Sequence, residues 1–272
     1  MPSDERSHPL RYVALGDSQT EGVGDGDDAT GLRGFADRLA ELMAARLDPE
    51  VRYANLAVRG RLAGAVRAEQ LAPALALRPD LATVVAGVND LLRPGFDADE
   101  VAGDLEAMFA ALTAQGARVA TVTFPDLTRL IPLARGLSPR LIALNHRVRQ
   151  AAERHGVALA DFGSHPATAD PRMWSFDRLH ASPLGHARIA AGLARSLELP
   201  GSDDSWTRPL PGPPPLGPKG LRGAVGEVRW AVGFLGPWIG RRLRGRSSGD
   251  GRTAKRPALL PVRDSADGSV GA

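Results

Sequence analysis

The sequence predicts an α/β protein in which helices cover both faces of a parallel sheet. Two features support this class. Through the first 200 residues, short apolar segments alternate with longer segments whose apolar residues recur at helical spacing. The short segments are apolar on both of their faces, which is typical of strands that lie between two layers of helices.

Five short segments fit the strand pattern. The first is an apolar run that ends at Gly16, and the fourth is stopped by Pro125. The third, with the sequence LATVVAG, is β-branched and apolar on both faces, as a central parallel strand should be. The predicted strands comprise residues 11–15, 51–57, 81–87, 117–124 and 157–161.

Four longer segments fit the helix pattern. The first carries one apolar stripe that runs from Phe35 to Leu47, and the third is followed by Gly156, a typical helix stop. The predicted helices comprise residues 35–47, 101–112, 139–155 and 183–197. In parallel sheets the reactive groups gather at the carboxyl ends of the strands, so we expect a functional site in the loops that follow them.

The composition divides the chain into four parts. Residues 1–9 are predicted to be an N-terminal extension, and residues 10–199 contain all the predicted strands and helices of one folded domain. Residues 200–219 are rich in Pro and Gly and are predicted to form an extended linker. Residues 220–272 are predicted to be a basic, largely disordered tail.

The charge is distributed unevenly along the chain. Residues 1–200 contain 22 Arg, no Lys and 25 acidic residues, whereas residues 201–272 contain 12 basic and 6 acidic residues. The positive charge is confined to the tail and only 5% of residues are aromatic, so we expect no nucleic-acid partner. Residues 220–246 combine Arg with apolar side chains, which is compatible with weak contact to a membrane surface, or with docking onto the domain or a partner.

The sequence contains no Cys, which excludes disulfides, thiolate metal sites and Cys nucleophiles. The first nine residues contain no apolar run that would suggest a secretory signal. No uninterrupted apolar segment reaches the ~18 residues that a membrane-spanning helix needs, so we expect a cytoplasmic protein. We also expect no metal, because His146 and His155 lie on a predicted helix at a spacing that does not share a face.

Polar residues suited to hydrolysis follow the predicted strands. Ser18, Gly60 and Asn89 follow the first three strands, and Asp177 and His180 come after the fifth. Ser18 would be the nucleophile, His180 the base that takes its proton, and Asp177 the carboxylate that orients the imidazole. The backbone N–H groups of Ser18 and Gly60, with the Asn89 amide, would bind an oxyanion. Taken singly, Ser18 also fits a helix N-cap, and Gly60 and Asn89 also fit turns.

The set of Ser18, Gly60, Asn89 and His180 resembles the GDSL family of esterases and lipases, whose other name, SGNH hydrolases, gives these four residue types. The order of the residues, their loop positions and the spacing of Asp177 and His180 all agree with that family. The resemblance covers residues 10–199. It implies a flavodoxin-like, three-layer α/β/α sandwich that hydrolyses an ester without a metal or a cofactor.

Four further residues bear on this interpretation. Gln19 stands where the family usually has Leu, and we interpret it as variation in the pocket or the packing. Thr20 stands where the G-x-S-x-G motif of the α/β-hydrolases has its second Gly, which separates this sequence from that group. Trp174 and Phe176 precede Asp177 and could wall an acyl pocket, although packing explains them equally well.

The functional hypothesis is a serine ester hydrolase that cleaves small or lipid-like acyl esters through an acyl-enzyme on Ser18. The same residues would also serve an acyltransferase or a carbohydrate deacetylase. A non-catalytic binding protein on this fold is the alternative from a different class, and the presence of all five site residues disfavours it.

Overall fold

The computed structural model describes residues 8–126, 131–213 and 248–262, and its middle layer is a six-stranded sheet. Along the sheet the strands lie in the order β7-β6-β5-β1-β4-β8. The first five are parallel, and their order is that of flavodoxin-like folds, as predicted. They comprise β1 (Arg11–Gly16), β4 (Arg52–Asn55), β5 (Leu81–Val85), β6 (Arg118–Val122) and β7 (Ala158–Ala160).

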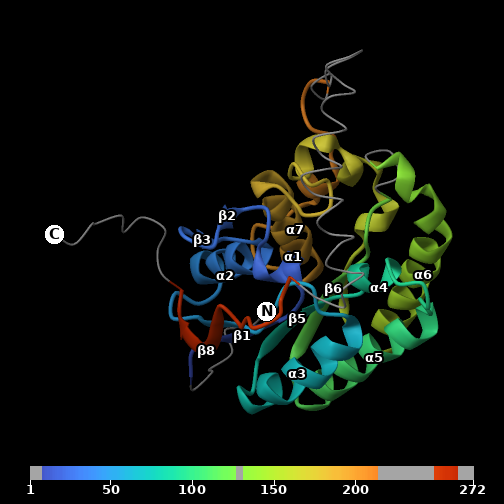
Figure 1. Cartoon of the computed structure of the whole chain (residues 1–272). Helices are drawn as coiled ribbons and strands as arrows, with labels where there is room; N and C mark the ends of the chain where they lie inside the picture. Colours follow the sequence, from blue (N-terminus) through green and yellow to red (C-terminus); the bar gives the residue numbers. More distant parts are fainter. Residues whose placement is uncertain (1–7, 127–130, 214–247, 263–272) are drawn as a thin grey trace.

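The sixth strand, β8 (Arg256–Pro261), lies antiparallel to β4 at the edge of the sheet (Figure 1). The prediction of five strands was therefore one short, and the prediction of a largely disordered tail is wrong for residues 248–262. The segment is held by partners that are distant in sequence, which its own composition does not reveal. Arg256 donates to the Tyr53 carbonyl at 2.7 Å, and its guanidinium lies over the Tyr53 ring.

Helices cover both faces of the sheet (Figure 1). One face carries α3 (Ala63–Ala76), α5 (Ala98–Ala114) and α6 (Ser138–Arg154), and the other carries α2 (Phe35–Arg46) and α7 (Pro183–Ser196). The sequence predicted all of these except α3, which is rich in Ala and contains Pro73. Among the helices that the structure describes, none is long and apolar enough to cross a membrane.

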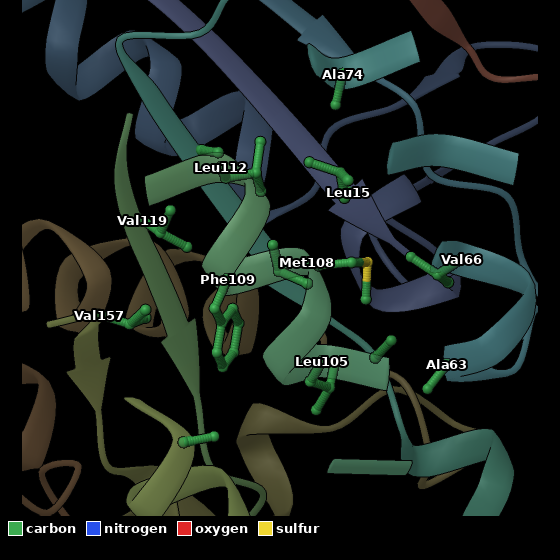
Figure 2. Close-up of a cluster of buried hydrophobic side chains, with 14 of the residues drawn as sticks. Leu15, Ala63, Val66, Ala74, Leu105, Met108, Phe109, Leu112, Val119 and Val157 are labelled. Atoms are coloured by element: carbon green, nitrogen blue, oxygen red, sulfur yellow. The ribbon is translucent and has the colours of Figure 1, made fainter. Parts of the chain in front are cut away.

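The core is divided into two clusters by the alternation of side chains along the central strand. Val13 and Leu15 face the α3, α5 and α6 layer, whereas Tyr12 and Ala14 face the α2 and α7 layer. In the first cluster one face of α5 packs across the sheet (Figure 2). The α5 side chains that do so are Leu105, Met108, Phe109 and Leu112.

Short elements connect these layers. The helices α1 (Ser18–Glu21) and α4 (Val88–Leu91) begin just after β1 and β5, and β2 (Gly26–Asp27) pairs with β3 (Gly31–Leu32). After β6, the described residues form five short 3-10 helices: η2 (Pro132–Leu137), η3 (Phe162–Ser164), η4 (Pro166–Ala169), η5 (Pro171–Met173) and η6 (Asp204–Thr207). The turns at the carboxyl ends of the strands therefore carry much of the irregular structure.

The segment predicted to be an extended linker packs on the domain where the structure describes it. Trp206, in η6, is buried, and its ring centroid lies 4.7 Å from that of Phe162 and 4.9 Å from that of His165. The linker prediction is therefore wrong at η6, because one large aromatic side chain outweighs the surrounding Pro and Gly. Residues 1–7 and 214–247, which include most of the predicted extension and the candidate membrane-contact segment, lie outside the described residues.

We expect Trp206→Ala to lower the free energy of unfolding by about 3 kcal/mol, because it empties a filled aromatic site. Ile142→Ala, at a position that is 68% exposed, serves as the control and should cost less than about 0.5 kcal/mol. Urea unfolding followed by circular dichroism measures both values. Equal stability of Trp206→Ala and the wild type would contradict the packing of η6.

Candidate active site

Ser18 is the first residue of α1 and follows the central strand after one residue, Asp17. The turn between them needs Gly16, because a Cβ at this position would overlap the Thr20 hydroxyl and the Val85 carbonyl. The Asp17 side chain caps the helix by accepting a hydrogen bond from the Gln19 N–H at 3.2 Å. This sharp turn places Ser18 at the carboxyl edge of the sheet, where sequence analysis expected a site.

Ser18, His180 and Asp177 form one hydrogen-bonded chain. The Ser18 Oγ lies 2.9 Å from the His180 Nε2, and the His180 Nδ1 lies 2.5 Å from the Asp177 Oδ2. Because an ionised Asp177 accepts only, Nδ1 carries the proton and Nε2 is left to accept from the Ser18 hydroxyl. The chain has the polarity that a base needs in order to take a proton from a hydroxyl group.

The Asp177 carboxylate is surrounded by donors. Its second oxygen accepts from the Ser175 hydroxyl at 2.7 Å and from the backbone N–H groups of Leu179 and His180, each at 2.9 Å. Burial raises the pKa of Asp177, but the hydrogen bonds and the charge of His180 outweigh it and lower the pKa to about 2. Asp177 is therefore ionised throughout the neutral range.

His180 stands on a small hairpin outside the sheet. Trp174 and Ala181 form an antiparallel bridge, and the Ser175 N–H donates to the His180 carbonyl at 2.8 Å. The turn passes through the left-handed region at Arg178, where φ is +62°. This conformation lets Asp177 bind the backbone of the residues after the turn, so the carboxylate and the imidazole are fixed together.

Gln19 connects the nucleophile loop to this hairpin. Its Nε2 donates to the Leu179 carbonyl at 2.8 Å, and its Oε1 accepts from the Ala181 N–H at 3.2 Å. The amide thus binds the backbone on both sides of His180. The expectation that Gln19 is pocket or packing variation does not include this contact, although an amide in place of Leu indicates polar partners.

Two further loops complete the pocket around Ser18. Gly60 has φ +78°, and the Asn89 Nδ2 donates to the Asp17 Oδ2 and to the Arg61 carbonyl, both at 3.1 Å. Ser18, Gly60, Asn89 and His180 line one pocket, together with Asp177. The structure therefore brings together all five residues that the sequence singled out as reacting or as oxyanion donors.

Asp17 is buried beneath this pocket. Burial raises its pKa to about 7, against the opposing effects of the Gln19 N–H, the charge of His180 and the Asn89 amide. The two carboxylates of the site therefore differ in their proton affinity, since Asp177 is shifted downward and Asp17 upward.

A mainly apolar groove adjoins the pocket, with which it shares Gln19, Val88, Leu92 and Leu179. Trp174 lines this groove and also a second cavity. Phe176 is 73% exposed and lines neither cavity, so the structure does not bring it into the site. The other apolar residues of the groove include Leu91, Phe124, Ile131, Leu137 and Leu141.

The acidic residues of the turn at 25–28, near the pocket, form ion pairs with arginines. Asp25 pairs with Arg38 at 2.5 Å, and Asp28 pairs with both Arg59 and Arg252. Within the described ranges, no three His, Asp or Glu side chains are grouped so that they could hold a metal ion.

We expect Asp17→Asn to stabilise the protein at high pH and not at low pH. The pKa of Asp17 is raised from 3.8, so the folded chain binds its proton more tightly and loses stability as the pH rises from about 4 to about 7. Asn removes this loss, and the expected gain at pH 8 exceeds about 1.4 kcal/mol, the equivalent of one pKa unit. Urea unfolding at pH 4, 6 and 8 measures it.

Asp177→Asn is the matched control because its pKa is shifted the other way. Its ionised form contributes stability that is present above the ordinary pKa of 3.8 and is lost as the pH falls toward 2. This variant should therefore be less stable than the wild type at pH 8. If the difference in free energy of unfolding between Asp17→Asn and the wild type did not change with pH, the raised pKa of Asp17 would be contradicted.

Comparison with known proteins places this geometry in a family. The sequence matches the GDSL-like Lipase/Acylhydrolase family over residues 14–188, whereas a search of curated proteins found no match. Similar solved structures include LAE5, an alpha/beta hydrolase enzyme from the metagenome of Lake Arreo, Spain, with 22% identity, a TM-score of 0.58, and coverage of 70% of this chain and 97% of that one.

Two other structures are similar to the same extent. TesA has 21% identity and a TM-score of 0.58, and the likeness covers 70% of this chain and 98% of TesA. The acetylxylan esterase Axe2 from Geobacillus stearothermophilus has 19% identity and a TM-score of 0.58, with 74% and 97% covered. At these identities the similar structures establish only the fold. The family match, which covers most of the domain, establishes family membership. The chain belongs to the GDSL-like lipase/acylhydrolase family.

Proposed function

We propose that this protein is a serine ester hydrolase that works through an acyl-enzyme on Ser18. The observation that carries the proposal is the hydrogen-bonded chain of Ser18, His180 and Asp177, which opens on a pocket lined by Gly60 and Asn89. Family membership supports the same class of reaction.

In the first step the Ser18 Oγ attacks the carbonyl carbon of the ester. As the new C–O bond forms, the hydroxyl proton passes to the His180 Nε2, which lies within hydrogen-bond distance. The imidazolium that results is stabilised by Asp177, whose lowered pKa keeps it ionised. The carbonyl π electrons become the negative charge of a tetrahedral oxyanion.

The oxyanion is bound by the Ser18 and Gly60 N–H groups and the Asn89 amide. The Asn89 Nδ2 has two N–H groups, which donate to Asp17 and to the Arg61 carbonyl in this structure, so one of them exchanges its partner for the oxyanion. Preorganised donors of this kind each contribute about 10²–10³ in turnover, because they are aligned before the charge develops.

Collapse of the tetrahedral species breaks the bond to the alcohol. The His180 imidazolium returns its proton to the departing alkoxide, and the acyl group remains on Ser18. A water molecule then attacks the acyl-enzyme while His180 takes its proton, and the second collapse releases the acid and restores the Ser18 hydroxyl. These reaction steps use no oxidant and no cofactor.

The groove beside the pocket favours an apolar acyl chain over an acetyl group. It shares Val88, Leu92 and Leu179 with the pocket that holds Ser18, so these apolar side chains lie between the attacked carbonyl and the groove. Burying each methylene against such side chains contributes about 0.8 kcal/mol. We therefore propose esters of acyl chains longer than acetyl as substrates.

We expect wild-type protein to hydrolyse p-nitrophenyl esters of two to twelve acyl carbons, with the highest kcat/KM at a chain longer than two carbons. Ser18→Ala should abolish hydrolysis because the nucleophile is missing. Release of nitrophenol measures the rate, and labelling of Ser18 by a fluorophosphonate reports the activated hydroxyl.

The outcomes separate the competing functions. If the wild type neither cleaves any of these esters nor takes the label, the hydrolase proposal fails and a binding protein is favoured. Ester products that appear when an alcohol is added would instead identify an acyltransferase, and activity confined to acetylated sugars would identify a deacetylase.

We expect Leu141→Asp to shift chain-length preference, because it places a charge in the groove. The ratio of kcat/KM for octanoyl over acetyl ester should fall about tenfold, the equivalent of about 1.4 kcal/mol. Ile142→Asp, the neighbouring residue on α6, is exposed and outside the groove lining, and should leave the ratio unchanged. Equal ratios in all three proteins would contradict the groove as the acyl site.

A further inference from the structure

The 248–262 segment reaches the pocket that holds the nucleophile. Ser248 lines the same pocket as Ser18 and His180, although the segment lies far from both in the sequence. The composition of this part of the chain predicts a disordered tail. The contacts that the segment makes beside Gly60 indicate a specific role.

Gly249 is buried against the loop that carries Gly60. A Cβ on Gly249 would overlap the Arg59 carbonyl oxygen and would approach the Val58 Cγ1 within 3.1 Å. Only a glycine fits this contact without displacing the loop. Gly249 therefore packs directly on the carbonyl group that precedes Gly60.

This carbonyl and the Gly60 N–H belong to one peptide unit. A trans peptide is planar and its C=O and N–H point in opposite directions, so a contact that fixes the oxygen also fixes the direction of the N–H. The Gly60 N–H is an oxyanion donor in the proposed mechanism. The packing of Gly249 on the Arg59 carbonyl thus acts on the orientation of that donor.

A series of ion pairs holds the same loop from its other side. The Arg252 guanidinium binds Asp28 at 2.6 Å, and Asp28 also binds the Arg59 guanidinium at 2.8 Å. Arg59 in turn contacts Glu21, whose carboxylate accepts from the Arg59 guanidinium and from its backbone N–H, each at 2.7 Å. Glu21 lies on α1, so this network joins the 248–262 segment to the helix of the nucleophile.

The rest of the segment is anchored to the body of the domain. The Lys255 ammonium binds Asp37 at 2.6 Å and the Leu32 carbonyl at 2.9 Å, and β8 then pairs with β4. These contacts lie away from the pocket. They hold the segment in place, whereas Gly249 and Arg252 transmit its position to the Arg59–Gly60 peptide.

We propose that the 248–262 segment positions the Arg59–Gly60 peptide for oxyanion binding, with Gly249 and Arg252 as positioning residues. The inference rests on the proposed ester hydrolysis. It states that residues outside the family match at 14–188 help to position an oxyanion donor. It assigns a function in catalysis to a part of the chain beyond that match.

Four variants of the full chain test the proposal in matched pairs. Gly249→Ala introduces the overlapping Cβ, whereas Gly95→Ala adds a Cβ to another loop, at an exposed position outside the left-handed region with nothing within 4 Å. Arg252→Ala removes an exposed Arg–Asp pair that leads to Arg59, whereas Arg195→Ala removes a similarly exposed pair with Asp204 that lies elsewhere. Each pair separates positioning from a general loss of stability.

The readouts are kcat and KM for a nitrophenyl ester, the Kd for phenylboronic acid, and Tm. Phenylboronic acid forms a tetrahedral adduct on a nucleophilic serine, so its affinity reports the oxyanion site. Gly249→Ala should lower kcat by about 10-fold to 100-fold with KM within twofold, since small misplacements of catalytic groups have effects of this size. The Kd should rise by a similar factor, and Arg252→Ala should show a smaller change of the same kind.

Wild-type kcat and Kd in both Gly249→Ala and Arg252→Ala would overturn the inference, as would equal losses in the two control variants. If Gly249→Ala loses its cooperative thermal transition, Arg252→Ala and its control decide the question alone. Absence of both turnover and fluorophosphonate labelling in the wild type would instead remove the proposed function, and the inference with it. The two failures are therefore distinguishable.

Discussion

The hydrogen bond between Ser18 and His180 is the constraint on which the site depends, because it joins residues from opposite ends of the domain. The central strand fixes Ser18, but no strand of the sheet fixes His180. The hairpin that carries His180 is instead held by Asp177 from within and by Gln19 from the nucleophile loop. The residue next to the nucleophile thus helps to place the base.

Burial and hydrogen bonding together set the protonation states of the groups around this bond. Asp177 is kept ionised by its donors, whereas burial raises the pKa of Asp17 to about 7. Burial also lowers the pKa of His186 to about 4, so this ring is neutral at pH 7 and its Nδ1 accepts from the Phe35 N–H at 3.1 Å. At pH 7, Asp177 is therefore ionised and His186 is neutral.

The sequence predicted the five parallel strands and the residues at their ends because buried apolar runs and loop motifs are local signals. It missed α3, whose Ala and Pro residues give little periodicity, and β8, which is defined by its pairing with β4. The burial of Trp206 and the amide contacts of Gln19 were also missed, since each depends on a partner that is distant in sequence. What could not be predicted is therefore the set of contacts between distant segments.

The antiparallel strand β8 has a consequence for the order in which the chain is made. A nascent chain folds from its N-terminal part, so β4 leaves the ribosome long before the strand that covers it. Until Arg256–Pro261 emerge, the backbone donors and acceptors at the edge of β4 are open to pairing with other chains. The segment that covers this edge also places Ser248 in the lining of the pocket. The edge of β4 is therefore covered, and the pocket completed, when the same late segment has been synthesised.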